Sequence, residues 1–416
     1  MRLLFIFVLS LLNPWFLLSQ AIETPEPYYI KSIQFKGGTN QAQLPIIRLG
    51  GKLVLSFDDL RANEADYYYR ISHYNFDWTP SDLSKGEYLD GFDDVRIEQY
   101  TNSFNSLQLY AHYEVAFPNR ETRALKKSGN YMIHIYNDDG DLVFARKFML
   151  LEDQVTVGVA IKRSRDLAYI DTKQAVQFTI YSNDKLLINP DRSVKTMVLQ
   201  NSNLKTAITD LKPQYTIGQE LIYRYDQPAA FWAGNEFLNF DSKEARVANV
   251  GIRRIELNDL FEHYLYTQSP RKNRPYTYYP DINGNFVVRS LGVQNSQIEA
   301  EYIFMHFGLR YDEPLNGRKL YVNGNFNNYD LNVANELLFN TESGLYETVL
   351  LLKQGFYNYN FALEETDGTV NLGAVDGNYW QTENQYSVLV YYRGPGDRYD
   401  QLIGMGQGNS NMITTN

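Results

Sequence analysis

The stretch that decides the fold is Tyr67–Leu83, YYYRISHYNFDWTPSDL, which runs from a tyrosine cluster into a Thr-Pro turn signal. Three stretches follow in which apolar and polar residues alternate: EYLDGFDDVRI (87–97), LYAHYEVAFPN (109–119) and KSGNYMIHIY (127–136). Alternation with a period of two is typical of strands that bury one face, and a Thr-Pro pair marks a turn. Residues 67–136 therefore predict the core of an immunoglobulin-like β-sandwich.

The composition favours strands throughout the chain. Its 416 residues include 34 Tyr and 23 Phe, which pack well on the half-buried face of a sheet. No stretch of useful length has the 3.6-residue period of an amphipathic helix. We therefore expect an all-β protein made of immunoglobulin-like β-sandwich domains in series.

Charge and cysteine content exclude several classes of function. The formal net charge of −10 repels phosphate backbones and anionic membrane surfaces, so we expect no nucleic-acid partner. The chain has no cysteine. Its absence excludes a disulfide scaffold, a thiolate metal site, a cysteine nucleophile and lipid attachment at an N-terminal Cys.

Residues 1–21, MRLLFIFVLSLLNPWFLLSQA, predict a secretory signal peptide. Arg2 supplies the positive charge, residues 3–18 the apolar run, and Ser19-Gln20-Ala21 a cleavage site of small residues. The alternative is an uncleaved anchor helix, which the Asn13-Pro14 interruption and the short run disfavour. We expect an exported protein.

Turn signals and strand-like runs divide the rest of the chain into three blocks. We expect an immunoglobulin-like sandwich over residues 22–151, a second β-sandwich over 152–298 and an early-set immunoglobulin-like domain over 299–393. Residues 394–416 are rich in Gly and Asn and predict a flexible tail.

His73, Asn75 and Asp77 are the first candidates for chemistry. On a strand they would share one face, and His and Asp are metal-ligand types, so a metal or acid–base site is one hypothesis. The plainer interpretation is a polar cluster that hydrogen-bonds the turn before Pro80, with Trp78 filling a core.

Two acidic turns, DDGD (138–141) and DINGN (281–285), suggest calcium but lack the loop length and the later Glu of a calcium hand. Both are better interpreted as hairpin turns. The sequence has no phosphate-binding Gly loop, nucleophile elbow or zinc-protease motif. We predict no catalytic, cofactor-binding or metal site.

The third block carries two sharper motifs, YVNGNFNNY (321–329) and GLYETVLLLKQGFYNYNF (344–361). They resemble the early-set module of glycogen-binding and isoamylase-type proteins, in which a strand leads to a Gly-x-Phe-Asn-x-Trp turn and a later hairpin reads Gly-x-Tyr-x-Tyr-x-Phe. The matching positions are Gly324, Phe326, Asn327, Asn328, Gly355, Tyr357, Tyr359 and Phe361. Tyr329 replaces the sugar-stacking Trp and Asn360 replaces a Lys. The resemblance implies the fold; sugar binding would use Tyr329 and Trp380 as stacking rings.

Across residues 28–393, the sequence features follow one another in the order known from one family. They are His-x-Asn-x-Asp-Trp-x-x-Ser at 73–81, Gly-Phe at 91–92, Tyr-x-His-Tyr at 110–113, Pro-Asn at 118–119, Ser-Gly-Asn-Tyr at 128–131 and Trp-x-Thr-x-Asn-x-Tyr at 380–386. This order resembles the plug protein of the type IX secretion translocon. The family-motif positions, with a structural or interface role, are His73, Asn75, Asp77, Trp78, Gly91, Tyr110, Pro118, Gly129 and Trp380.

The resemblance implies a non-enzymatic periplasmic subunit, monomeric when free. It would bind the periplasmic mouth of a very large outer-membrane β-barrel, occlude the empty pore, and lie at the outer membrane only through protein contact. Tyrosines suit such an interface because they bury large areas at little rotamer cost. The candidate docking surfaces are Tyr67–Tyr69, Tyr276–Tyr279 with Arg271–Arg274, and the C-terminal tail.

Two other functions compete with this one. The first is a carbohydrate-binding envelope protein that uses the early-set domain. The second is an enzyme, because early-set modules often precede a catalytic barrel of about 250 residues. Fewer residues than that follow the module here, so we expect no enzyme.

Overall fold

The computed structural model describes residues 20–37, 44–182 and 185–413. In this part of the chain it contains thirty strands and four α-helices of one turn each, which confirms the predicted all-β fold. None of the described helices is long and apolar enough to cross a membrane. Most of the predicted signal peptide, residues 1–19, lies outside the described residues.

The first sandwich packs two sheets around a shared core. One sheet has the order β1 (Ile30–Lys36), β3 (Leu53–Asp59), β8 (Ala111–Phe117), β7 (Tyr100–Asn102); the other has β2 (Ile46–Arg48), β11 (Leu142–Leu151), β10 (Gly129–Asn137), β4 (Tyr67–Tyr74), β6 (Val95–Arg96). Along β4 the buried side chains alternate, and Tyr67, Tyr69 and Ile71 enter the core. Helix α1 (Lys85–Tyr88) and a small sheet of β5 (Leu89–Gly91) and β9 (Thr122–Leu125) complete this body.

The second sandwich is assembled from two distant parts of the chain. One sheet holds β12 (Thr156–Arg163), β13 (Lys173–Tyr181), β17 (Glu220–Tyr223) and β16 (Tyr215–Ile217), with β18 (Ala230–Trp232) beside β13. The other holds β15 (Asn203–Thr209), β14 (Val194–Gln200), β29 (Gln385–Tyr392) and β30 (Gln401–Asn409). Helix α2 (Pro190–Ser193) precedes β14, and the 3-10 turn η2 (Ser410–Met412) follows β30. Val194 pairs with Tyr392, so the C-terminal strands complete a sheet that begins near residue 194.

The predicted flexible tail is therefore wrong for residues 401–409, which form β30. Its glycines are there because β30 runs close against β12. A Cβ at Gly404 would lie 2.4 Å from Val155, and one at Gly406 would lie 2.5 Å from the Val157 carbonyl oxygen. Glycine within a strand marks such a close approach, whereas composition alone suggests disorder.

The third body is a single curved sheet. Its order is β19 (Leu238–Asp241), β27 (Gly355–Glu364), β24 (Lys319–Asn323), β25 (Glu336–Asn340), β26 (Leu345–Lys353), β23 (Tyr302–Leu309), β21 (Phe261–Leu265), β20 (Ile252–Leu257). Strands β22 (Phe286–Val288) and β28 (Val370–Asn371) also pair with β27, and α3 (Ser296–Glu299), the 3-10 turn η1 (Asn325–Asn327) and α4 (Gly373–Asp376) lie in its loops. Phe240 and Ile252, from strands at opposite ends of the order, share one core, so the sheet curls around it.

The predicted domain boundaries at 298/299 and 393/394 do not coincide with the bodies that the strand pairing defines. Strands β19 to β22 belong to the third body, and β29 and β30 belong to the second. The motif at 344–361 is no hairpin either, because β26 pairs with β23 and β25 whereas β27 pairs with β24 and β19. The early-set resemblance stays a prediction.

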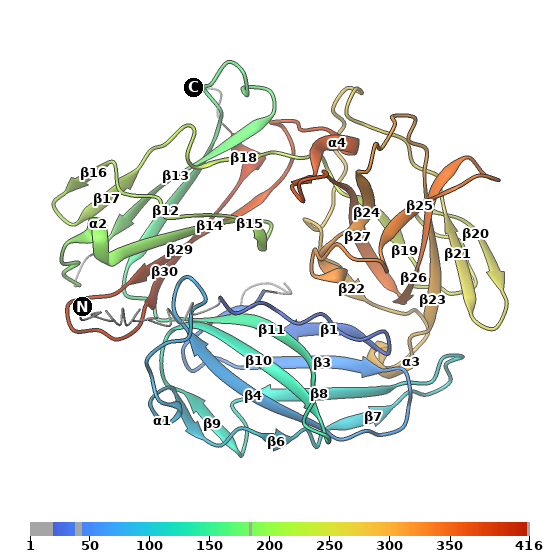
Figure 1. Cartoon of the computed structure of the whole chain (residues 1–416), viewed down its shortest axis with the longest axis horizontal. Coiled ribbons are helices and arrows are strands. Elements are labelled where there is room, and N and C mark those ends of the chain that lie inside the picture. The colour runs from blue at the N-terminus through green and yellow to red at the C-terminus, as the bar shows by residue number, and fades with distance from the viewer. Residues whose placement is uncertain (1–19, 38–43, 183–184, 414–416) are drawn as a thin grey trace, which may run out of the picture.

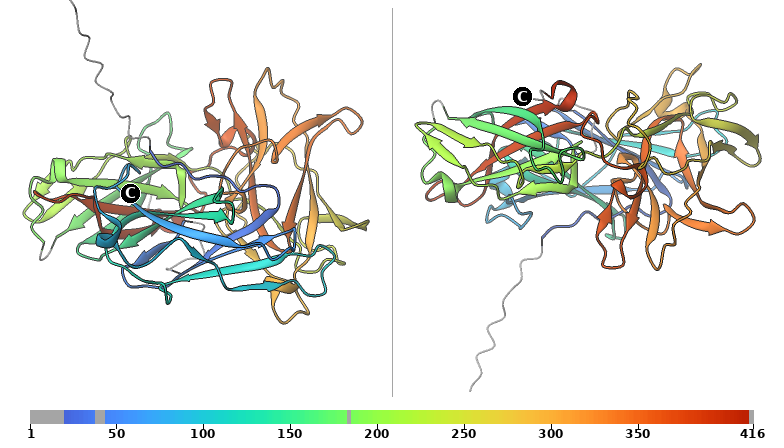
Figure 2. Two further views of the ribbon diagram at one scale, coloured as in Figure 1. Left: turned by 60° about the horizontal axis from the view of Figure 1, so that its bottom comes forward. Right: turned by 90° about the horizontal axis from the view of Figure 1, so that it is seen from above.

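The three bodies are arranged in a triangle (Figure 1). The first sandwich lies along one side of the triangle. The split second sandwich and the curved third body lie next to each other on its other two sides, and each contacts the first sandwich. Seen from the other directions the molecule is flatter than it is wide (Figure 2). The first sandwich therefore has one junction with each neighbour.

Candidate functional site: the junctions of the first sandwich

The junction with the second sandwich has an apolar core of its own. It joins Leu44, Tyr74, Phe76, Trp78, Met132, Ala145, Met149 and Leu151 of the first sandwich to Met197, Leu199, Leu389, Tyr391 and Leu402 of the second. The Phe76 ring meets Tyr391 edge-on at 5.0 Å. Two sheets joined in this way pack like the halves of one domain core, not like a wet surface contact.

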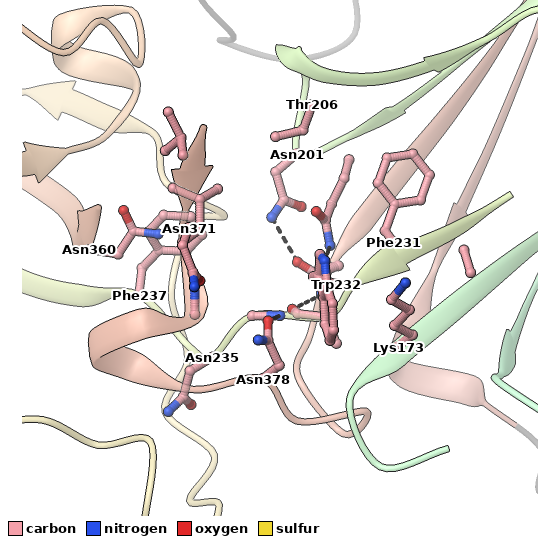
Figure 3. A pocket seen from close by; sticks show the side chains of 18 of the residues that line it. Lys173, Asn201, Thr206, Phe231, Trp232, Asn235, Phe237, Asn360, Asn371 and Asn378 are labelled. Atoms are coloured by element: carbon pink, nitrogen blue, oxygen red, sulfur yellow. Dashed lines mark hydrogen bonds between the residues drawn. The ribbon is translucent and has the colours of Figure 1, made fainter. Parts of the chain in front are cut away.

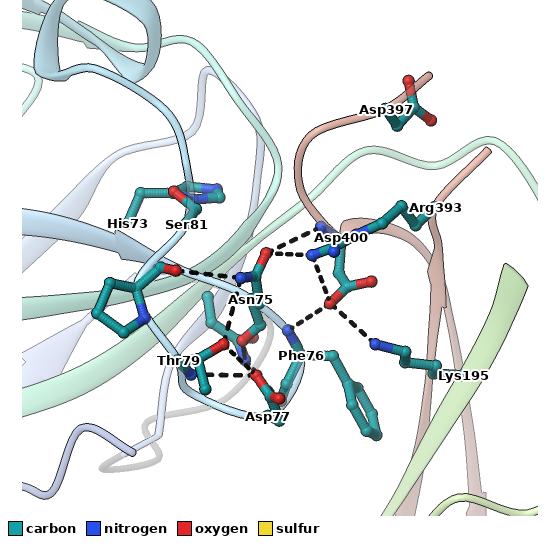
Figure 4. Close-up of polar contacts among 12 residues, drawn as sticks. His73, Asn75, Phe76, Asp77, Thr79, Ser81, Lys195, Arg393, Asp397 and Asp400 are labelled. Atoms are coloured by element: carbon teal, nitrogen blue, oxygen red, sulfur yellow. Dashed lines mark hydrogen bonds and ion pairs between the residues drawn. The ribbon is translucent and has the colours of Figure 1, made fainter. Parts of the chain in front are cut away.

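A buried carboxylate lies beside this apolar core. Asp400, only 1% exposed, accepts the backbone N–H of Phe76 at 3.1 Å and ion-pairs with Lys195 and Arg393 at 3.2 Å each (Figure 4). Arg393 also donates to the side-chain oxygen of Asn75. A buried carboxylate needs charge and hydrogen-bond partners. Asp400 lies in the loop before β30 and takes one of these partners from the turn after β4, so the contact stabilises both segments.

The structure places the alternating motif in two environments, because β4 ends at Tyr74. His73 points back into the first sandwich, with Nδ1 2.8 Å from the Ser81 hydroxyl and Nε2 3.1 Å from the Ser128 carbonyl. Burial lowers the pKa of His73 to about 4, so the ring is neutral at pH 7. Among the described residues, no group of three or more metal-ligating side chains could hold a metal ion.

Asn75 and Asp77 lie in the turn itself. The Asn75 amide donates to the Thr79 hydroxyl at 3.2 Å, and the Asp77 carboxylate accepts the backbone N–H and the hydroxyl of Thr79 at 3.1 and 2.6 Å. Trp78 is buried, and Lys147 lies 4.3 Å above its ring. These side chains fix the shape of the turn that reaches the second sandwich.

Two motif glycines permit close backbone approaches. Gly91 has a φ of +98°, and a Cβ there would lie 1.9 Å from the Glu121 carbonyl oxygen. Gly129 has a φ of +132°, and a Cβ there would lie 2.9 Å from His73 Nε2 and 3.1 Å from the Asp400 carbonyl oxygen. Gly129 therefore leaves room for both the His73 ring and the Asp400 backbone. Pro118 follows Phe117 in the loop between β8 and β9 of the first sandwich.

A buried polar cluster lies at the centre of the junction with the third body. The carboxylate of Asp58 on β3 accepts from Lys353 Nζ at 2.5 Å and from the Tyr302 hydroxyl at 2.6 Å, and its other oxygen lies 2.6 Å from His112 Nδ1. Neither Asp58 nor Lys353 has an exposed side-chain atom. Tyr110 lies 4.1 Å below the Lys353 ammonium and donates to the Ala300 carbonyl at 3.0 Å.

Opposing effects set the pKa of Asp58. Burial acts to raise it, but Lys353 and His112 outweigh burial and hold it below its usual range. Burial lowers the pKa of Lys353, while Asp58 opposes that change. We infer that the pair is ionised, with both charges compensated inside the junction.

Residues 30–152 match the sequence profile of the family described as Type 9 secretion system plug protein 1st domain. This segment of the chain belongs to the type IX secretion plug family. The matched segment is the first sandwich, whose two junctions are described above.

A solved structure is similar to this protein over nearly the whole chain. The crystal structure of a hypothetical protein from Parabacteroides merdae ATCC 43184 at 2.30 Å resolution has a TM-score of 0.89 and 31% sequence identity to it. The similarity covers 94% of the present protein and 100% of the chain from Parabacteroides merdae. A search of curated proteins finds no match.

The two rings expected to stack on sugar, Tyr329 and Trp380, lie in different cavities of this protein. Tyr329 lines a cavity of about 20 Å³ with Glu23 and Asn328, and its buried hydroxyl has no partner among the described residues. Trp380 lines another cavity with Tyr276 and carries Arg163 4.5 Å above its ring. They do not form one sugar platform.

The expected tyrosine docking surface at 67–69 is also absent, because Tyr67 and Tyr69 are buried in the first core. Tyr276 is hydrogen-bonded to Glu236, whereas Tyr278 and Tyr279 are more than half exposed. Of the tyrosines proposed for docking, these two offer the most surface.

The charged residues buried at the two junctions were not predicted from the sequence. Asp58 is one of two adjacent carboxylates, and Lys353 ends an apolar strand. A lysine or aspartate within such a run is a signal of burial with a partner. Nothing in the spacing says that these two residues, 295 positions apart, are each other's partners.

Proposed function

We propose that this chain occludes the empty pore of the type IX secretion translocon by docking on the periplasmic mouth of that outer-membrane β-barrel. Membership of the plug family indicates a role in type IX secretion, association with its machinery and an envelope or periplasmic location. Docking and occlusion are the further steps of the proposal.

The observation that carries the proposal is the way the bodies are locked together. An apolar core joins the first and second sandwiches, and a buried ion pair joins the first sandwich to the third body. A stopper must span a wide opening without deforming, and three β bodies fixed side by side are wider than any one of them. An exposed, polar-rimmed patch suits a contact that has to release for cargo; Tyr278 and Tyr279 provide aromatic surface for it.

Affinity purification with crosslinking tests the docking step. The tagged protein, isolated from envelopes, should recover one very large outer-membrane protein, with crosslinks that cluster on one face. Replacing Tyr278 and Tyr279 by Ala should lower that recovery. The matched control replaces Tyr215 and Ile217, which are similarly exposed on β16, and should leave recovery unchanged. Failure to recover any barrel would contradict docking.

A permeability assay tests occlusion separately. Cells that lack this protein should admit a hydrophilic dye too large for ordinary porins, but only when the translocon is present. An equal dye signal with and without the protein would show that it docks without closing the pore.

A further inference from the structure

A cleft between the second sandwich and the third body has the features of a ligand site. It encloses about 460 Å³, within the usual size range for small-molecule pockets. Lys173 and Trp232 line it from the second sandwich, and Asn360, Asn371 and Asn378 line it from the third body (Figure 3).

Trp232 supplies an aromatic surface to the cleft. Its side chain is about half exposed (51%), unusual for so large a ring. Lys173 Nζ lies 4.3 Å from the ring, and Tyr169 meets the ring edge-on at 5.5 Å. In Figure 3 the ring stands between Lys173 and the third body, whose Asn371 and Asn360 lie across the gap. The ring is therefore held by neighbours while part of it still borders the cleft.

The cleft also presents hydrogen-bond donors that the fold does not use. The side-chain oxygens of Asn360, Asn371 and Asn378 accept from Asn323, from the Gly373 N–H and from the Gly234 N–H. Within the described part of the chain, their NH₂ groups and the Lys173 ammonium make no hydrogen bond. The fixed oxygens orient the three amides, so their NH₂ groups are free for a ligand. The Lys173 ammonium lies over the rings of Trp232 and Tyr169, and its N–H groups remain available as donors.

The cleft has fewer free hydrogen-bond acceptors than free donors, and the acceptor comes from the second sandwich. Gln200 donates from its amide nitrogen to the Trp232 carbonyl at 3.0 Å and to the Tyr386 hydroxyl at 3.1 Å. This leaves its oxygen as an acceptor beside three amide donors and one ammonium. The ligand that fits must be rich in acceptors and carry negative charge.

We propose that this cleft binds a short acidic oligosaccharide. A sugar ring has an apolar C–H face that packs on an indole, and its hydroxyl groups accept hydrogen bonds from amide NH₂ groups at its edge. A carboxylate on the sugar would meet the Lys173 ammonium in a charge-assisted hydrogen bond. This site is separate from the cavities that hold Tyr329 and Trp380 and does not depend on docking to the translocon.

Binding to an array of defined neutral and acidic oligosaccharides tests the proposal on the full-length protein. Uronic-acid oligomers of two to four units should bind, and the best binder is then titrated while tryptophan fluorescence is followed. Its methyl ester, which has the same shape without the charge, should bind about tenfold more weakly. Absence of binding by every acidic oligomer at about 1 mM would overturn the proposal, as would equal binding of acid and ester.

Variants assign the binding to the cleft. Trp232→Ala should weaken binding at least about tenfold, and Trp232→Phe should restore part of it. Lys173→Met should remove the preference for the acid over its ester. Trp380→Ala, which changes the other candidate ring, should leave affinity unchanged. Full affinity in Trp232→Ala, or loss in Trp380→Ala alone, would overturn the assignment; thermal unfolding checks that each variant folds.

Discussion

Lys353 and Asp58 are each other's ionic partner, and neither has exposed side-chain surface. Removing one member of a buried pair leaves an uncompensated charge in a medium of low polarity, which costs more than the pair contributes. The Tyr302 hydroxyl and His112 add two contacts to the Asp58 carboxylate. The junction therefore depends on the whole group of polar side chains and not on one bond.

Lys353→Met should lower the free energy of unfolding by about 3–5 kcal/mol, because Asp58 loses its cation. The double variant Asp58→Asn with Lys353→Met should recover part of that loss. Urea denaturation measures both. The control is Lys319→Met, because the Lys319 side chain is half exposed in its pair with Glu336, and it should change stability by less than about 1 kcal/mol. Equal effects of the buried and exposed changes would contradict this account of the junction.

His73 should make stability depend on pH. Its pKa is lowered from 6.5 to about 4 in the folded protein by burial, so the unfolded chain binds more protons between these values. The stabilising effect is therefore complete above about pH 6.5 and is lost as the pH falls toward about 4.

The difference in unfolding free energy between pH 7 and pH 4.5, measured by urea denaturation, should be smaller in His73→Gln than in the unchanged protein. A full site contributes up to about 3 kcal/mol over this range. Burial also lowers the pKa of His134 and His263, so the variant should keep part of the acid sensitivity. Identical pH dependence in both proteins would show that His73 is not neutral and buried in solution.

At the scale of the element, β30 is held by backbone contact with the strand that it crosses. Gly406→Ala should lower the free energy of unfolding by about 1–3 kcal/mol, because its Cβ would lie 2.5 Å from the Val157 carbonyl oxygen. Chemical denaturation measures the effect. Gly86→Ala in α1, where a Cβ meets nothing within 4 Å, is the matched control and should change stability by about 1 kcal/mol or less.

Strands themselves could be predicted from the sequence, because each depends on local alternation. Tyr67, Tyr69 and Ile71 alternate in sequence and are buried alternately in β4. The assignment of strands to bodies could not be predicted, since it depends on pairing between distant residues. Val194 pairs with Tyr392, and no local pattern in either segment specifies the other. The junction charges were missed for the same reason, whereas the turn motif at 75–80 was visible because its bonds are local.

At the scale of the whole molecule, the first two sandwiches should unfold together. Their shared apolar cluster includes Phe76, which is 4% exposed. Phe76→Asp would bury a charge against Tyr391 and should separate the two sandwiches without unfolding either core. Calorimetry should then show a second transition, and small-angle scattering a larger radius of gyration. Phe92→Asp, at an exposed ring of the same sandwich, should change neither measurement.

The second sandwich also imposes an order on biogenesis. A ribosome makes all of β19 to β28 before it makes β29 and β30, so β14 waits for its sheet partner while the third body is already available to fold. A nascent or prematurely terminated chain that stops before residue 385 exposes the unpaired edge of β14 and half an apolar core. We expect a chain that ends too soon to be more sensitive to proteases than the complete chain, because this edge and half-core stay exposed.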